Sequence, residues 1–72
     1  MIRRGATGAA VAEVRARLAH LGYVDYPASV AEAGSFDDDL DRAVRAFQQE
    51  RGLSVDGIVG PDTYRRLDQA RW

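Results

Sequence analysis

The sequence predicts an all-α fold, a small bundle of three helices around one core. Apolar residues recur every three or four positions in three separate segments, which is the spacing of one face of an α-helix. Glycine follows the first two segments and proline opens the third, as expected at helix ends and starts. The chain has 72 residues and no cysteine. One thin core must therefore hold a single domain, residues 1–72, without disulfides.

The first helix is predicted over about residues 9–21. Its apolar stripe consists of Val11, Val14, Leu18 and Leu21. Gly22 should end the helix in the left-handed conformation, and Tyr23 should then fold back onto the last turn. His20 lies off the apolar stripe, so we expect it on the surface.

The second helix is predicted over about residues 37–51. Its apolar face consists of Leu40, Ala43, Val44 and Phe47. Asp37 is the expected N-cap, and further aspartates fill the first turn, where negative charge complements the helix dipole. Gly52 and Leu53 repeat the glycine stop and the apolar return that follow the first helix.

The third helix is predicted over about residues 61–70. Pro61 suits its first position, because a missing N–H costs nothing there. Tyr64 and Leu67 should face the core. Trp72 either caps the bundle or packs on a following domain.

A long connection, residues 23–36, separates the first two helices. Ser29 and Glu32 form an S-x-x-E pattern typical of a capping box, which predicts one helical turn there. A connection of this length is either variable or functional.

The chain contains an internal repeat of one helix and its following loop. Residues 14–16 match residues 44–46, and a glycine follows eight positions after the valine in each copy. The segments that open the next helix also correspond, residues 34–40 with residues 57–63. The first loop is seven residues longer than the second.

Composition excludes several classes of function. The net charge is −1, with ten arginines and no lysine, which argues against a nucleic-acid-binding protein. No apolar run is long enough to span a bilayer, and residues 1–4 are not followed by a signal-peptide core. A chain this small has little room for an enclosed active site, and a single histidine cannot form a metal cluster. We therefore expect no enzyme activity, no metal and no cofactor.

The residues of the second half carry a specific pattern. Residues 43–48 read AVRAFQ, residues 52–53 read GL, residues 56–63 read DGIVGPDT, and Leu67 follows. Together with Gly8, Val11, Leu18 and residues 21–23, this pattern resembles the peptidoglycan-binding domain family over nearly the whole chain. The resemblance is closest to the N-terminal module of actinobacterial N-acetylmuramoyl-L-alanine amidase-like proteins.

This resemblance implies a three-helix, non-catalytic module that binds peptidoglycan, through its glycan or its stem peptide, as a monomer. It also implies an attached cell-wall hydrolase, a zinc-dependent amidase, whose catalytic residues lie outside this chain. The expected location is the cell wall, outside the cytoplasm, although the absence of a visible signal peptide leaves a cytoplasmic location open. Neither a membrane nor a nucleic acid is an expected partner.

The expected ligand site is a shallow groove near the turn that precedes the third helix. Its candidate residues are Tyr26, Arg45, Gln48, Asp56, Gly57, Ile58, Gly60 and Thr63. Carboxylate, amide and guanidinium groups can bind sugar hydroxyls and peptide groups, and Tyr26 can stack on a sugar. Each has a purely structural alternative: Asp56 and the glycines can simply form the turn, and Gln48 can brace it.

Two departures from the family pattern leave a second function open. Arg15 stands where the family commonly has glutamine, and Ala33-Gly34 replaces the usual Asp-Gly. Both positions are expected to be exposed near the site. The alternative is a regulatory protein-interaction module that has lost glycan binding.

Overall fold

The computed structural model describes residues 1–70, which form four helices. These are α1 (Ala9–His20), α2 (Val30–Ala33), α3 (Asp38–Glu50) and α4 (Pro61–Gln69). The all-α prediction is confirmed. The segments expected at 9–21, 37–51 and 61–70 correspond to α1, α3 and α4. The prediction for Trp72 lies outside the described residues.

The additional helix, α2, is a single turn within the long connection. Ser29 is its N-cap, and the Ser29 hydroxyl accepts a hydrogen bond from the N–H of Glu32 at 3.1 Å. The S-x-x-E pattern therefore marks a real helical turn, which makes four helices where the sequence predicts three main ones.

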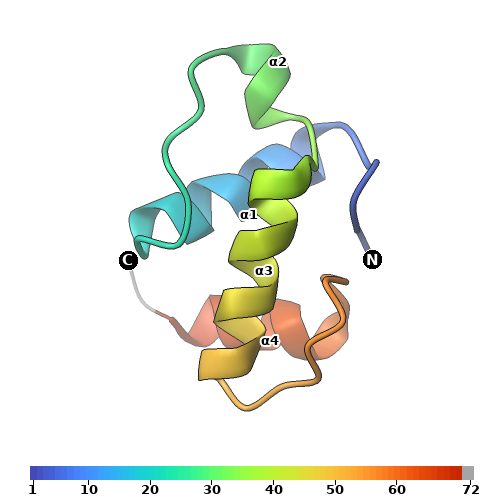
Figure 1. Cartoon of the computed structure of the whole chain (residues 1–72), viewed down its shortest axis with the longest axis vertical. Coiled ribbons are helices and arrows are strands. Elements are labelled where there is room, and N and C mark those ends of the chain that lie inside the picture. Colours follow the sequence, from blue (N-terminus) through green and yellow to red (C-terminus); the bar gives the residue numbers. More distant parts are fainter. Residues whose placement is uncertain (71–72) are drawn as a thin grey trace.

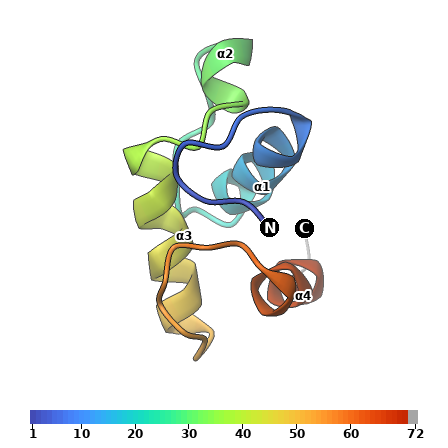
Figure 2. The same ribbon diagram turned by 90° about the vertical axis from the view of Figure 1, so that its right-hand side faces the viewer.

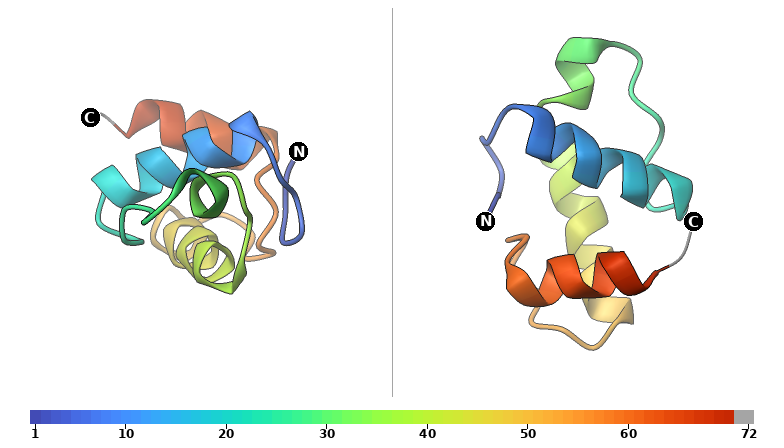
Figure 3. Two further views of the ribbon diagram at one scale, coloured as in Figure 1. Left: turned by 90° about the horizontal axis from the view of Figure 1, so that it is seen from above. Right: turned by 180° about the vertical axis from the view of Figure 1, so that it is seen from behind.

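The three longer helices form two layers. α1 and α4 lie side by side and run in the same direction, and α3 crosses both of them on one side (Figures 1 and 3). No helix within residues 1–70 combines the length and apolar character needed to cross a membrane.

The core lies where α3 crosses the other two helices. Its fully buried apolar residues come from all three long helices and from the loops that precede α3 and α4. They are Val11, Val14, Leu18, Phe36, Leu40, Ala43, Val44, Phe47, Val59 and Leu67. The expected stripes of the three helices thus meet in one cluster.

The two glycine stops have the same hydrogen bonds in both copies of the repeat. Gly22 and Gly52 have positive φ angles of 92° and 72°. The following N–H of Tyr23 bonds to Leu18 O at 2.9 Å, and that of Leu53 bonds to Gln48 O, also at 2.9 Å. These bonds satisfy carbonyl groups that a helix end otherwise leaves unpaired.

The N-terminal segment, residues 1–8, ties the loops of the two repeats together. Ile2 and Val59 exchange two backbone hydrogen bonds of 3.2 and 2.8 Å, and Phe36 bonds through its N–H to Ala6 O at 3.0 Å. Figure 2 shows this segment running between α1 and the loop before α4. The segment has no apolar periodicity, so its place could not be predicted from the sequence.

Candidate functional site

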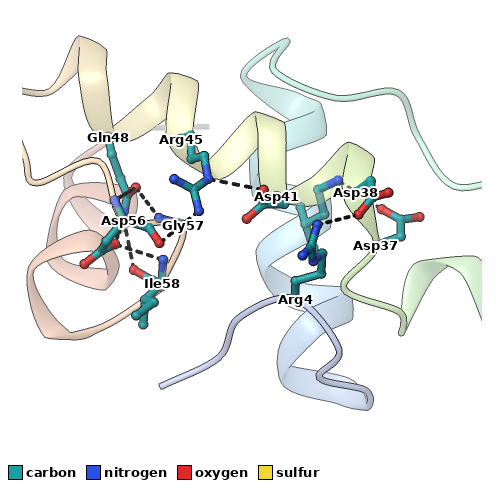
Figure 4. A network of polar contacts seen from close by, with 10 residues as sticks. Arg4, Asp37, Asp38, Asp41, Arg45, Gln48, Asp56, Gly57 and Ile58 are labelled. Carbon is teal, nitrogen blue, oxygen red and sulfur yellow. Dashed lines mark hydrogen bonds and ion pairs between the residues drawn. The ribbon is translucent and has the colours of Figure 1, made fainter.

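The side chain of Gln48 supports the loop before α4 from the side of the core. This residue of α3 is 1% exposed. Its amide nitrogen donates to Asp56 Oδ1, Ile58 O and Thr63 Oγ1 at 2.9, 3.0 and 3.1 Å. Its amide oxygen accepts from the N–H groups of Asp56 and Gly57 at 3.2 and 3.1 Å (Figure 4). Gln48 and Thr63 therefore brace the turn from inside, and both polar atoms of the Gln48 amide are already bonded within the protein.

Asp56 closes the turn above this amide. Its Oδ1 accepts a hydrogen bond from the N–H of Ile58 at 2.9 Å, which is an Asx-turn. This bond, followed by the bond from the Gln48 amide, lowers the pKa of Asp56 below its ordinary value. The exposed carboxylate is therefore ionised at neutral pH.

Arg45 and Asp41 flank the turn on its α3 side. Arg45 Nε lies 3.2 Å from Asp41 Oδ2, and Arg45 Nη2 donates to Asp56 O at 3.3 Å. Gly57 is buried next to this ion pair with a φ of 73°. A Cβ atom at Gly57 would lie 2.6 Å from Asp41 Oδ1 and 2.8 Å from Arg45 Nη2.

Gly57 and Gly52 provide a matched test of this close approach. Their φ angles are nearly equal, 73° and 72°, but a Cβ atom at Gly52 meets nothing within 4 Å. Gly52→Ala should cost about 1–2 kcal/mol, the strain of a left-handed non-glycine residue. Gly57→Ala should cost more, because the Asp41–Arg45 ion pair must also move. Urea unfolding of both variants tests this, and equal losses would contradict it.

Two shallow hollows border the Asp56 turn. The first, here the Pro61 hollow, has a volume of about 250 Å³, and its walls include Met1, Leu53, Ser54, Ile58, Gly60 and Asp62. The second, the Arg45 hollow, has a volume of about 290 Å³, and its walls include Arg3, Arg4, Asp41, Asp56 and Gly57. Seven of the eight predicted residues therefore lie at or beneath these two hollows.

No sequence pattern points to the N-terminal residues of the site. Met1, Arg3 and Arg4 reach the hollows because the N-terminal segment pairs with Val59 and Phe36. Arg4 also lies 3.0 Å from Asp38 Oδ1 at the start of α3 (Figure 4). Only the folded chain brings these residues to the turn.

Tyr26 does not lie with the other predicted residues. It is 65% exposed and lines neither hollow. The connection that carries it leads to α2, at the opposite end of α3 from the loop that follows Gly52 (Figure 1). The structure therefore separates Tyr26 from the Asp56 turn, because the loop with Tyr26 enters the N-terminal end of α3 and the loop with Asp56 leaves its C-terminal end.

The expectation that Arg15 is exposed is wrong. Its side chain is 1% exposed, and Nη2 donates to Ser35 O and to Asp37 Oδ1, both at 2.8 Å. Arg15 therefore braces the loop before α3 as Gln48 braces the loop before α4. The second departure, Ala33-Gly34, is half-buried.

The carboxylates of Asp37 and Asp56 make stability depend on pH. Burial tends to raise the pKa of Asp37, but the N–H of Leu40 and the Arg15 guanidinium lower it below the ordinary value. A lowered pKa means that the unfolded chain binds the proton more tightly. The contribution of these two carboxylates to the free energy of unfolding should therefore be fully present above about pH 4, the ordinary pKa of aspartate. It should be lost progressively as the pH falls below that value.

Asp37→Asn tests this dependence. Asparagine keeps the N-cap but removes the charge beside Arg15. Urea unfolding from pH 7 to pH 2.5 should show a smaller loss of stability for the variant than for the wild type. The same pH dependence in both would contradict the assignment.

Residues 1–70 contain no group of three or more side chains suited to hold a metal ion. The geometry instead defines a small binding module, with shallow polar hollows around a fixed turn. The chain belongs to the family described as putative peptidoglycan binding domain, whose family model matches residues 7–67.

The chain is similar to parts of larger cell-wall hydrolases. It is 49% identical to N-acetylmuramoyl-L-alanine amidase CwlM of Mycobacterium tuberculosis, over 99% of this chain and 19% of that protein. It is 38% identical to the spore cortex-lytic enzyme of Halalkalibacterium halodurans, over 96% of this chain and 20% of that protein. The crystal structure of the SleB N-terminal domain is 36% identical, with a TM-score of 0.85 over 96% of this chain and 89% of that one.

These comparisons confirm the predicted family and the non-catalytic, peptidoglycan-binding character of the module. The chain spans about a fifth of the length of the first two relatives, for which the similarity covers this module alone. Peptidoglycan binding also associates the module with the cell wall.

Proposed function

We propose that residues 1–72 act as one unit that binds the glycan part of peptidoglycan at the Asp56 turn. The observation that carries this proposal is the turn itself. Gln48 fixes it through five hydrogen bonds, so its polar groups are held in place before a ligand arrives. A preorganised surface loses less conformational entropy on binding.

The charges around the turn favour a polar, uncharged ligand. Two of the three arginines in the Arg45 hollow already face carboxylates, Arg4 with Asp38 and Arg45 with Asp41. This pairing reduces their attraction for an anion and leaves hydrogen-bonding groups. The Pro61 hollow adds the Ser54 side chain and the Asp56 carboxylate to an apolar wall of Leu53 and Ile58. Sugar rings present hydroxyl groups and apolar faces that match such walls.

In the complete protein, the module would target an attached cell-wall hydrolase, a zinc-dependent amidase. The similarity to an amidase and to a cortex-lytic enzyme supports this role. Shallow hollows imply that the module binds each repeating unit of the polymer weakly. A polymer offers many sites, so rebinding holds a tethered enzyme on the wall. The module would then work outside the cytoplasm.

Co-sedimentation with insoluble peptidoglycan tests the proposal. Ser54→Tyr places a large side chain in the Pro61 hollow without touching the core, since Ser54 is exposed. We expect its affinity for peptidoglycan to fall at least tenfold, a loss of about 1.4 kcal/mol. Gln49→Tyr is the control, because Gln49 is exposed on α3 and lines neither hollow.

The folded wild type should sediment at low salt. If it stays in the supernatant, peptidoglycan binding is refuted for this chain. The regulatory alternative would then gain support from two exposed apolar side chains near α2, Tyr26 at 65% and Val30 at 91% exposure.

A further inference from the structure

A further hollow lies away from the Asp56 turn. This Arg15 groove has a volume of about 500 Å³, between the segment that follows α1, the end of α2 and one face of α3. Its walls include Arg15, Tyr23, Asp25, Glu32, Asp39 and Arg42. None of the predicted site residues lines it.

The internal repeat relates this groove to the Pro61 hollow. Tyr23 and Leu53 occupy equivalent positions after the two glycine stops, and Asp39 and Asp62 are equivalent near the starts of α3 and α4. Tyr23 and Asp39 line the Arg15 groove, whereas Leu53 and Asp62 line the Pro61 hollow. The fold therefore contains two related clefts, one beside each copy of the repeat.

The two clefts differ in the polar residue that braces each loop. Gln48 is neutral, and neither its amide nitrogen nor its amide oxygen lacks a partner. Arg15 carries a positive charge, is 1% exposed, and has a buried Nε with no hydrogen-bond partner. The carboxylate that it contacts, Asp37, is 38% exposed and is also the N-cap of α3. A buried guanidinium with an unpaired N–H is costly, and a second acceptor beside it would be favourable.

The rim of the groove has the opposite charge. Asp25 and Glu32 are exposed carboxylates on the two segments that face α3. Arg42 and Asp39 form an ion pair on α3. The groove thus places an incompletely neutralised cation at its base and carboxylates at its edge. This arrangement suits a ligand that carries a carboxylate and an ammonium group a short distance apart.

We infer that the Arg15 groove is a second binding site, which takes the peptide part of peptidoglycan. A carboxylate of the peptide binds beside the Arg15 guanidinium, and an amino group of the peptide faces Asp25 and Glu32. The inference rests on the proposed function, because the peptide belongs to the same polymer that the Asp56 turn binds. The two clefts of the repeat would then bind the two chemical parts of one polymer.

An NMR titration of the whole chain with a synthetic stem peptide that lacks sugar tests the inference. The Nε–H of Arg15 is shielded from water, so its signal reports directly on the base of the groove. We expect saturable shifts of this signal and of the amides of Tyr23, Val24 and Asp25. A sugar fragment without peptide should leave these signals unchanged.

Two variants and a control make the test specific. Asp25→Asn removes an exposed carboxylate that faces the peptide amino group in the proposed complex, and Arg15→Gln puts at position 15 a side chain that can still donate to Ser35 O. Each should weaken peptide binding at least tenfold. Arg66→Gln, on the exposed face of α4 outside the groove, should bind as the wild type does. If Arg15→Gln fails to fold, Asp25→Asn decides the result.

The outcomes separate this inference from the proposed function. If the wild type sediments with peptidoglycan but the peptide causes no shifts in the groove, the second site is refuted and the proposed function stands. If the peptide shifts the groove signals while Ser54→Tyr sediments as the wild type does, the groove is supported and the Asp56 turn is not the glycan site. Unchanged peptide affinity in Asp25→Asn would also refute the assignment.

Discussion

Replacing Phe47 with alanine is expected to lower the free energy of unfolding by about 3–5 kcal/mol. Phe47 is fully buried at the crossing of α3 with the other helices. Its ring packs edge-to-face against Tyr23, with centroids 5.5 Å apart, and the Arg51 guanidinium lies 5.1 Å from its centre. The variant loses these contacts and leaves a cavity where the repeats meet.

This loss is large for a chain of this size. A 72-residue domain has a total stability of roughly 4–11 kcal/mol, so Phe47→Ala should leave a substantial unfolded population. Urea unfolding followed by circular dichroism measures the effect. Phe47→Leu is the control, since it keeps much of the apolar volume and should lose clearly less. A loss below about 1.5 kcal/mol for Phe47→Ala would show that this crossing is not the main core.

Replacing Gln48 with leucine should cost about 3 kcal/mol or more, although the two side chains have similar volumes. Leucine fits the apolar surroundings but cannot bond to the loop. The buried N–H of Gly57 and the hydroxyl of Thr63 lose their partner, as does Ile58 O. Each buried polar group left unpaired costs about 1–3 kcal/mol.

The neighbouring Gln49 provides the control for this substitution. It is exposed on the same helix, and Gln49→Leu should change stability by less than about 0.5 kcal/mol. Gln48→Leu should also weaken peptidoglycan binding in the part of the protein that remains folded, because the Asp56 turn loses its support. Wild-type sedimentation of folded Gln48→Leu would show that a fixed turn is not required for binding.

Local physical chemistry was sufficient to predict the helices and their ends. Asp37 caps α3, Pro61 opens α4, and Gly22 and Gly52 adopt positive φ where a helix stop was predicted. Each of these features depends on neighbouring residues alone, so a single sequence contains the whole signal. The S-x-x-E pattern of α2 is likewise a signal that depends on neighbouring residues alone.

The candidate site was predictable in part. Arg45, Gln48 and the residues from Asp56 to Thr63 lie close together because α3 and the following loop are adjacent in sequence. The chemistry of Tyr26 predicts that it joins them, but the fold separates it from them. Chain order already places the two loops at opposite ends of α3, because the loop with Tyr26 enters its N-terminal end and the loop with Asp56 follows its C-terminal end.

Sequence by itself thus determined an all-α domain, its repeat and its family. Tertiary structure alone decided which polar residues are buried and which segments meet. Arg15 lies four residues after Val11 and three before Leu18, at the edge of the apolar face of α1, and the loop before α3 covers its charged side chain, whose guanidinium donates to Ser35 O and Asp37 Oδ1. The N-terminal arginines reach the Asp56 turn through backbone pairing, which any sequence can form and no side-chain pattern reports.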